Sequence, residues 1–181
     1  MFKYIAGLLT ISFFYLLISD ALSQKTATVA RIECHSKSTT FEYVYKNERV
    51  KSMQDAIKSG NVQLKSKFKL SEHMLTQLAK HISLSSVDEM IQKQVDSYVD
   101  TTHSTSDTLI IDYFIYENDK EDPGKKTAKS KLYAGYLVFN FLLKGEQVYR
   151  LQVDFMDTQG KDIEEKIECM LESVLTLHIV P

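Results

Sequence analysis

The stretch that decides the fold is residues 132–156, LYAGYLVFNFLLKGEQVYRLQVDFM. Large apolar side chains recur at every second position in both halves, and Lys144-Gly145 stands between the halves. This spacing predicts two antiparallel strands, over 132–143 and 147–156, joined by a tight turn. The residues that share the buried face are Tyr133, Leu137, Phe139, Phe141 and Leu143 on the first strand, and Tyr149, Leu151, Val153 and Phe155 on the second.

The flanking segments extend this hairpin into a larger sheet. Thr108–Glu117 is β-branched and aromatic on both faces, which is typical of a strand inside a sheet. Apolar residues recur at helical spacing from Lys161 to Leu177 and predict a closing helix.

The first half of the chain is read in the same way. Alternation predicts strands over Thr26–Cys34, Thr39–Lys46 and Val62–Leu70. Helical spacing predicts helices over 50–57, 71–82 and 86–99. We expect Ser71 to cap the second of these, and Ser86 with Glu89 to form a capping box on the third. The pattern predicts an α+β fold, with a mainly antiparallel sheet of about five to six strands and three to four helices in a single domain.

The N-terminus resembles an export signal. Lys3 precedes an apolar run over Tyr4–Ile18, and Ala21-Leu22-Ser23 supplies small residues for cleavage. The run is shorter than a membrane-spanning helix needs, and Asp20 closes it. We therefore expect residues 1–23 to be a secretory signal peptide and residues 24–181 a single globular α+β domain without a membrane span. The alternative is a retained anchor.

Export changes how the two cysteines are interpreted. Cys34 and Cys169 stand near opposite ends of the predicted domain, on the first strand and beside the apolar stripe of the last helix. In an oxidising compartment such a pair is expected to form a disulfide. The alternative is two buried thiols that never meet.

From Ser86 onward the order is helix, strand, polar loop, long hairpin and terminal helix. The segments SVDEMIQKQV, which begins at Ser86, and CMLESVL, which begins at Cys169, resemble the PsbP-like α+β domains. That resemblance implies an exported binding or assembly factor, and it carries over no active residue. The front half departs from the family because it lacks Trp and the Pro-Gly-Trp-like turn.

Composition and motifs argue against several function classes. Charge is nearly balanced, with 22 Lys+Arg against 24 Asp+Glu, so we expect no nucleic-acid partner. The five histidines have no metal-ligand spacing, and the chain has no Gly-x-Ser-x-Gly elbow or glycine-rich phosphate loop. We therefore predict no catalytic residue, no metal and no cofactor.

One polar loop separates the two most apolar strands. Residues 118–131 place acids before Pro123-Gly124 and bases after it. Polar loops on rigid sheets often carry binding residues, although this one could also be a solubilising connector. The candidate partner-binding residues are Tyr116, Asp119, Glu121, Asp122, Lys125, Lys126, Lys129 and Tyr133.

Two functions remain open at this point. The first is an exported, non-enzymatic binding or accessory protein of the cell envelope, periplasmic in a bacterium or secreted, whose partner is another protein. It could act as a chaperone or an inhibitor. The second is a small envelope hydrolase whose site is assembled from scattered residues. The oligomeric state is not predicted by the sequence.

Overall fold

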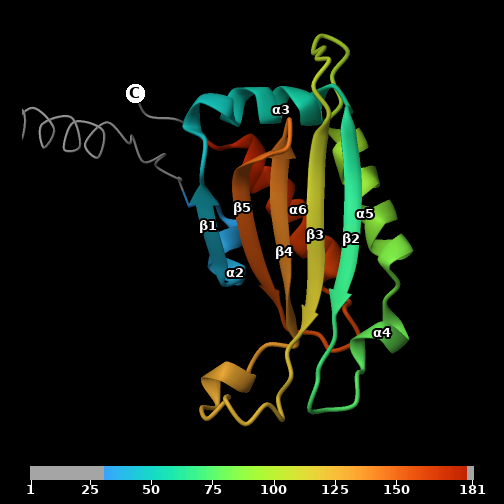
Figure 1. Ribbon diagram of the computed structural model, residues 1–181, viewed down its shortest axis with the longest axis vertical. Helices are drawn as coiled ribbons and strands as arrows, with labels where there is room; N and C mark the ends of the chain where they lie inside the picture. Colours follow the sequence, from blue (N-terminus) through green and yellow to red (C-terminus); the bar gives the residue numbers. More distant parts are fainter. Residues whose placement is uncertain (1–30, 179–181) are drawn as a thin grey trace, which may run out of the picture.

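The computed structural model describes residues 31–178, and its strands form one mixed sheet (Figure 1). The strands are β1 (Thr40–Val44), β2 (Val62–Lys69), β3 (Leu109–Glu117), β4 (Gly135–Leu143) and β5 (Glu146–Phe155). Their order across the sheet is β1-β5-β4-β3-β2. The predicted α+β class and strand number are confirmed. The predicted signal peptide lies outside the described residues.

The hairpin that was predicted from residues 132–156 forms the centre of the sheet. β4 and β5 pair antiparallel along their length, with Leu143 opposite Glu146. Lys144 and Gly145 connect them with φ angles of 53° and 79°. Positive φ at both central positions is the conformation of a type I′ turn, whose twist matches that of the flanking strands.

β2 and β3 pair parallel, whereas the other neighbours in the sheet are antiparallel. A parallel pair needs a crossover, and this one carries α4 (Leu78–His81) and α5 (Leu84–Ser97). The predicted helix over 71–82 is wrong for residues 71–77. Their backbone N–H groups bind the carboxylates of Glu117 and Asp119 in place of helical carbonyls, and Leu75 is 84% exposed.

The start of α5 also differs from the prediction. Ser83 is its N-cap: the Ser83 hydroxyl accepts from the Ser86 N–H at 3.0 Å, and the Ser86 hydroxyl accepts from the Ser83 N–H at 3.3 Å. The capping box is therefore a serine pair one turn earlier than predicted. At the other end, Tyr98 and Val99 are exposed, although the sequence pattern placed them on the buried face.

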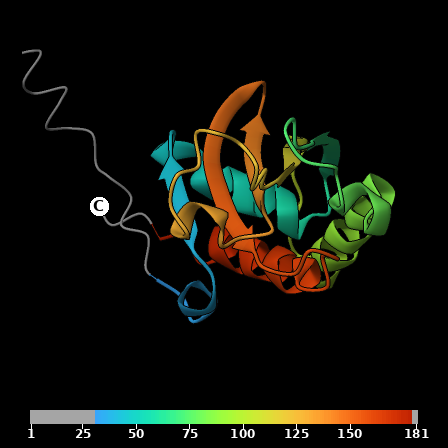
Figure 2. The same cartoon turned by 90° about the horizontal axis from the view of Figure 1, so that it is seen from below.

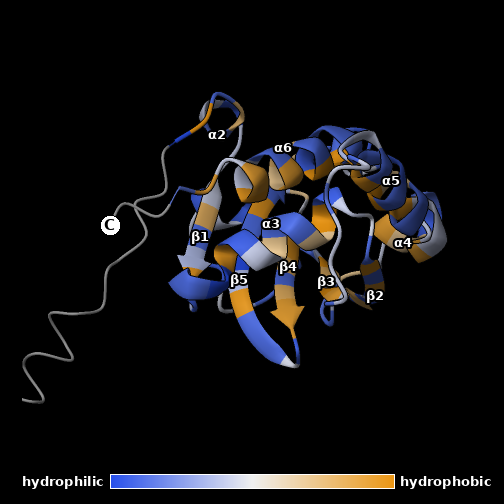
Figure 3. Ribbon diagram, turned by 90° about the horizontal axis from the view of Figure 1, so that it is seen from above, coloured by the Kyte–Doolittle hydropathy of each residue, from blue (hydrophilic) through white to orange (hydrophobic). Residues whose placement is uncertain are grey.

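Three longer helices share the core with the sheet. α5 and α6 (Ile163–Leu175) lie along one face of the sheet (Figures 2 and 3), and α3 (Val50–Lys58) crosses the upper ends of the strands (Figure 1). The Gln54 amide on α3 donates to the carbonyl of Val174 in the last turn of α6 at 3.0 Å. The fully buried side chains come from this face of the sheet and from the helices packed on it, among them Ile111, Tyr113, Leu137, Phe139, Tyr149, Leu151, Ile167 and Met170.

The first segment differs most from its prediction. Residues 31–34 are not a strand, and Cys34 begins a short helix, α2 (Cys34–Lys37), beside β1. Two 3₁₀ turns, η1 (Asn47–Arg49) and η2 (Lys129–Lys131), complete the elements. The described residues hold five α-helices, more than the three to four expected, because α2 and α4 are four-residue turns.

Candidate functional site

The candidate site is the face of the sheet opposite α5 and α6, which we call the open face. None of the helices α2–α6 covers it (Figure 2). Strand alternation and register place the following side chains there. They are Phe41, Tyr43, Lys65, Lys67, Lys69, Ile110, Asp112, Phe114, Tyr116, Tyr136, Val138, Asn140, Arg150, Gln152 and Asp154.

Lysines and an aromatic ring meet on the β2 side of this face. The ammonium groups of Lys67 and Lys69 lie 5.7 and 4.8 Å from the centre of the Phe114 ring. Lys67 also lies 3.7 Å from a carboxylate oxygen of Asp112, across the β2–β3 pair. The three alternating lysines of β2 are far from Phe114 in the sequence, so this basic aromatic surface could not be predicted from it.

Three tyrosines form a second cluster at the lower end of the open face. Tyr116 stacks on Tyr136 with ring centres 5.4 Å apart, and Tyr133 lies 6.1 Å from Tyr136. The ammonium group of Lys125 sits 5.4 Å from the Tyr116 ring centre. Three of the predicted site residues, Tyr116, Lys125 and Tyr133, are thus brought together through Tyr136.

The polar loop of residues 118–131 is anchored to the fold at its first residue. Asn118 is fully buried, and its amide donates to the carbonyls of Ser130 and Tyr133 at 3.1 and 2.8 Å. Its side-chain oxygen accepts a hydrogen bond from Lys125. The loop therefore holds Lys125 in a fixed place beside the tyrosine cluster.

Asp119 faces inward, although it was predicted to be a partner-binding residue of the polar loop. Its side chain accepts from the backbone N–H groups of Glu72 and His73 at 2.8 and 2.6 Å, and it is 3% exposed. Although burial raises the pKa of Asp119, these hydrogen bonds and that from the Glu121 N–H lower it overall. Asp119 thus joins loop 118–131 to loop 71–77.

Glu117, the last residue of β3, also holds loop 71–77. Its carboxylate accepts from the N–H groups of Gln77 and Leu78 at 2.6 and 2.9 Å and from the hydroxyls of Ser71 and Thr76. Burial alone raises the pKa of Glu117, but the hydrogen bonds outweigh it and lower this pKa to about 2. The sequence did not predict this role of Glu117, because the residue stands at the end of a strand that is otherwise mostly apolar.

The remaining loop candidates point to solvent or bind locally. Glu121, Lys126 and Lys129 are exposed, and Asp122 accepts from the Gly124 N–H at 2.8 Å. Among residues 31–178, no ion pair joins the acids of this loop to its bases. The acids and bases of this loop therefore do not neutralise one another through ion pairs.

An open depression of ≈ 440 Å³ adjoins the tyrosine cluster, between the α2–β1 segment and the end of β5. Asp154 lies in its wall, 3% exposed, and accepts from the Gln152 amide at 3.1 Å. Burial raises the pKa of Asp154, opposed by that hydrogen bond. Its lining includes Arg31, Lys37, Thr39, Phe41, Tyr133 and Met156.

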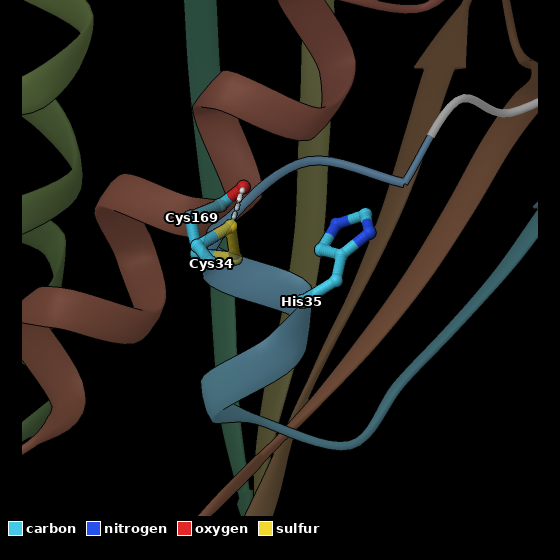
Figure 4. Close-up of side chains that lie close together, drawn as sticks. All are labelled: Cys34, His35 and Cys169. Atoms are coloured by element: carbon cyan, nitrogen blue, oxygen red, sulfur yellow. Dashed lines mark hydrogen bonds between the residues drawn. A yellow bond between two sulfur atoms is a disulfide. The ribbon is translucent and has the colours of Figure 1, made fainter.

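The predicted disulfide forms on the opposite side of the sheet. Cys34 and Cys169 are bonded, with their Cα atoms 5.7 Å apart, and the bond ties α2 to α6. His35 lies beside it (Figure 4), and one ligand atom from each of the three side chains lies within 4.8 Å of the others. Sulfurs bonded to each other are not thiolate ligands, so the oxidised site does not hold a metal through them.

A buried serine, histidine and glutamate also meet there. The Nε2 atom of His35 lies 2.7 Å from the Ser173 hydroxyl and 3.2 Å from a carboxylate oxygen of Glu42. A catalytic triad needs the serine and the acid on different ring nitrogens, with the serine open to substrate. Here both use one nitrogen, and Ser173 is 2% exposed. These three side chains link α2, β1 and α6. Their arrangement does not support the hydrolase hypothesis.

Within residues 31–178, no helix is both long and apolar enough to cross a membrane. The chain was also compared with protein-family models, with curated proteins and with solved structures, and none of them matched it. The resemblance to PsbP-like domains therefore stays a prediction.

Proposed function

We propose that this chain is an exported, non-enzymatic accessory protein of the cell envelope that binds another protein through the open face. The observation that carries this proposal is the open face itself. One side of the five-stranded sheet carries aromatic and basic side chains, and no helix within residues 31–178 covers it. The disulfide between Cys34 and Cys169 is compatible with export, and the predicted signal peptide supports it.

The charges of the open face indicate the chemistry of the partner. Lys65, Lys69 and Arg150 lie on it, and Lys125 borders it, whereas Asp112 is already beside Lys67. Exposed ion pairs contribute only about 0 to 1 kcal/mol each, so charge alone gives little affinity. Aromatic anchors contribute more when a partner covers them. The face therefore suits a protein surface that combines carboxylates with apolar side chains.

Capture by paired variants tests this proposal. Residues 24–181, immobilised with the native disulfide, are exposed to envelope extract, and the retained proteins are identified. Lys67→Glu with Lys69→Glu reverses two charges on the open face. Lys51→Glu with Lys93→Glu makes the same change on α3 and α5, where both side chains are exposed.

We expect the open-face variant to lose a partner that the wild type and the control variant retain, and we expect salt to weaken that capture. Equal retention by all three proteins would refute the open face as the docking surface. Retention of nucleic acid in place of protein would refute the proposed partner class.

A further inference from the structure

The two edges of the sheet are built differently. β2 forms one edge and carries three exposed lysines at alternate positions, Lys65, Lys67 and Lys69. β1 forms the other edge and presents Phe41 and Tyr43, with Tyr45 directly after it, at 61%, 60% and 45% exposure. Edge lysines are a common means by which proteins block unwanted strand pairing. β1 has neither lysine nor proline, so this edge lacks that protection.

Among the strands of residues 31–178, none pairs with the outer side of β1. The Thr39 carbonyl accepts from the Asp154 N–H at 3.1 Å, and the Tyr45 N–H donates to the Val148 carbonyl at 2.8 Å. Antiparallel pairing alternates, so the odd-numbered residues of β1 direct their backbone groups to β5. Those of Thr40, Glu42 and Val44 therefore point away from the sheet. β1 is the outermost strand in Figure 1.

From these two observations we infer that β1 pairs antiparallel with β1 of a second copy of this chain, in a register centred on Tyr43. Phe41 then lies opposite Tyr45 of the second copy, and Tyr43 lies opposite its own counterpart. These are non-hydrogen-bonded positions, where facing side chains approach most closely, and aromatic pairs there stabilise a sheet. The two sheets become one sheet of ten strands.

The partner is a second copy because the aromatic pattern is symmetric. Phe41, Tyr43 and Tyr45 map onto one another under the two-fold rotation that an isologous contact requires. A register centred on Glu42 would instead set two Glu42 side chains opposite each other and would form fewer aromatic pairs.

This dimer goes beyond the proposed function, because it would join two open faces across the β1 edges. The contact is a short strand with three aromatic side chains from each copy. Interfaces below about 1,200 Å² are weak. We therefore expect dimerisation that depends on protein concentration, and a test that captures transient pairs is needed.

Cysteine cross-linking tests both the pairing and its register with the purified exported form. The native cysteines are already bonded to each other, so one added cysteine supplies the single free thiol. Facing non-hydrogen-bonded positions have Cα atoms about 4.5 Å apart, within reach of a disulfide. Tyr43→Cys should therefore give a covalent dimer on mild oxidation.

The register is read from two companion samples. Phe41→Cys alone should cross-link at least tenfold less, because its counterpart lies about 13 Å away along the strand. A mixture of Phe41→Cys with Tyr45→Cys should cross-link as well as Tyr43→Cys. Equal cross-linking of Phe41→Cys and Tyr43→Cys would overturn the register and with it the inference.

Sedimentation velocity over a concentration series gives an independent measurement without added thiols. The wild type should shift from monomer to dimer, Tyr43→Lys should remain monomeric, and Leu75→Lys should behave as the wild type. Leu75 is a matched control because it is 84% exposed and lies outside the edge. A wild type that stays monomeric and a Tyr43→Cys protein that does not cross-link would refute the dimer. The proposed function would still stand, because these measurements use no extract.

Discussion

Glu117→Gln is expected to reveal how the two lower loops are held. The Glu117 carboxylate sits under residues 71–78 and accepts hydrogen bonds from three backbone N–H groups, those of Ser71, Gln77 and Leu78, and from two hydroxyls. Glutamine keeps the size of the side chain but removes the charge and one acceptor. Its amide N–H₂ would face groups that are themselves donors. The variant therefore removes the interactions that lower the pKa of Glu117.

The size of the effect follows from that pKa. The gap between the ordinary value of 4.5 and about 2 in the fold corresponds to ~3 kcal/mol of stability at neutral pH. Water reaches the surrounding loops and screens part of this, so we expect about 2 kcal/mol. Because the folded pKa is the lower one, this stability is present above pH 4.5. It is lost as pH falls from 4.5 towards 2.

Urea unfolding of wild type and Glu117→Gln, followed by circular dichroism at several values between pH 7 and pH 3, checks this expectation. The wild type should be more stable at pH 7, and more than half of the difference should be gone at pH 3. The other carboxyl groups titrate in both proteins and cancel in the comparison. A difference that stays constant from pH 7 to pH 3 would refute the reasoning.

Three further changes have expected outcomes. Replacing Cys34 and Cys169 together by serine should lower the free energy of unfolding by about 4 to 5 kcal/mol in the chain-entropy account; urea titration measures it, and a loss below about 1 kcal/mol would contradict that account. Gly135→Ala should cost about 1 to 3 kcal/mol or more, because its Cβ would collide with the Phe155 ring and the Tyr116 carbonyl; unchanged thermal stability would count against that packing. Asp119→Asn should speed hydrogen exchange at the amides of residues 72–73, and unaltered protection there would show that Asp119 does not hold loop 71–77.

Local patterns predicted most of the strands because large apolar side chains recur there at alternate positions. The side chains of β2 alternate between half-buried and exposed from Val62 to Lys69, and the sequence shows the same alternation of apolar residues with lysines. The turn at Lys144-Gly145 was also predicted correctly, since glycine readily adopts positive φ. The disulfide was predicted from compartment and placement, although Cys34 lies on a helix and not on a strand.

The errors came from hydrogen bonds between residues far apart in sequence. Residues 71–77 have apolar side chains at helical spacing, but carboxylates 40 or more positions away bind their N–H groups. Helical propensity is a weak preference, and the four hydrogen bonds that N–H groups of residues 71–77 donate to these carboxylates outweigh it. The sequence of residues 71–82 does not show that Glu117 and Asp119 bind this segment. The loop could therefore not be predicted from the local sequence.

The predicted site in loop 118–131 was incomplete, because the other residues of the candidate site are far from this loop in the sequence. The sequence separates Lys67 from Phe114 and Tyr43 from Arg150, yet strand pairing places each pair in adjacent positions of the open face. A linear scan for basic and aromatic clusters finds neither, because the cluster exists only across strands. Two of the predicted residues, Lys125 and Tyr133, lie at this surface, and the buried Asn118 side chain is hydrogen-bonded to both. The candidate site is therefore a property of sheet register, and the loop contributes to it chiefly through Lys125.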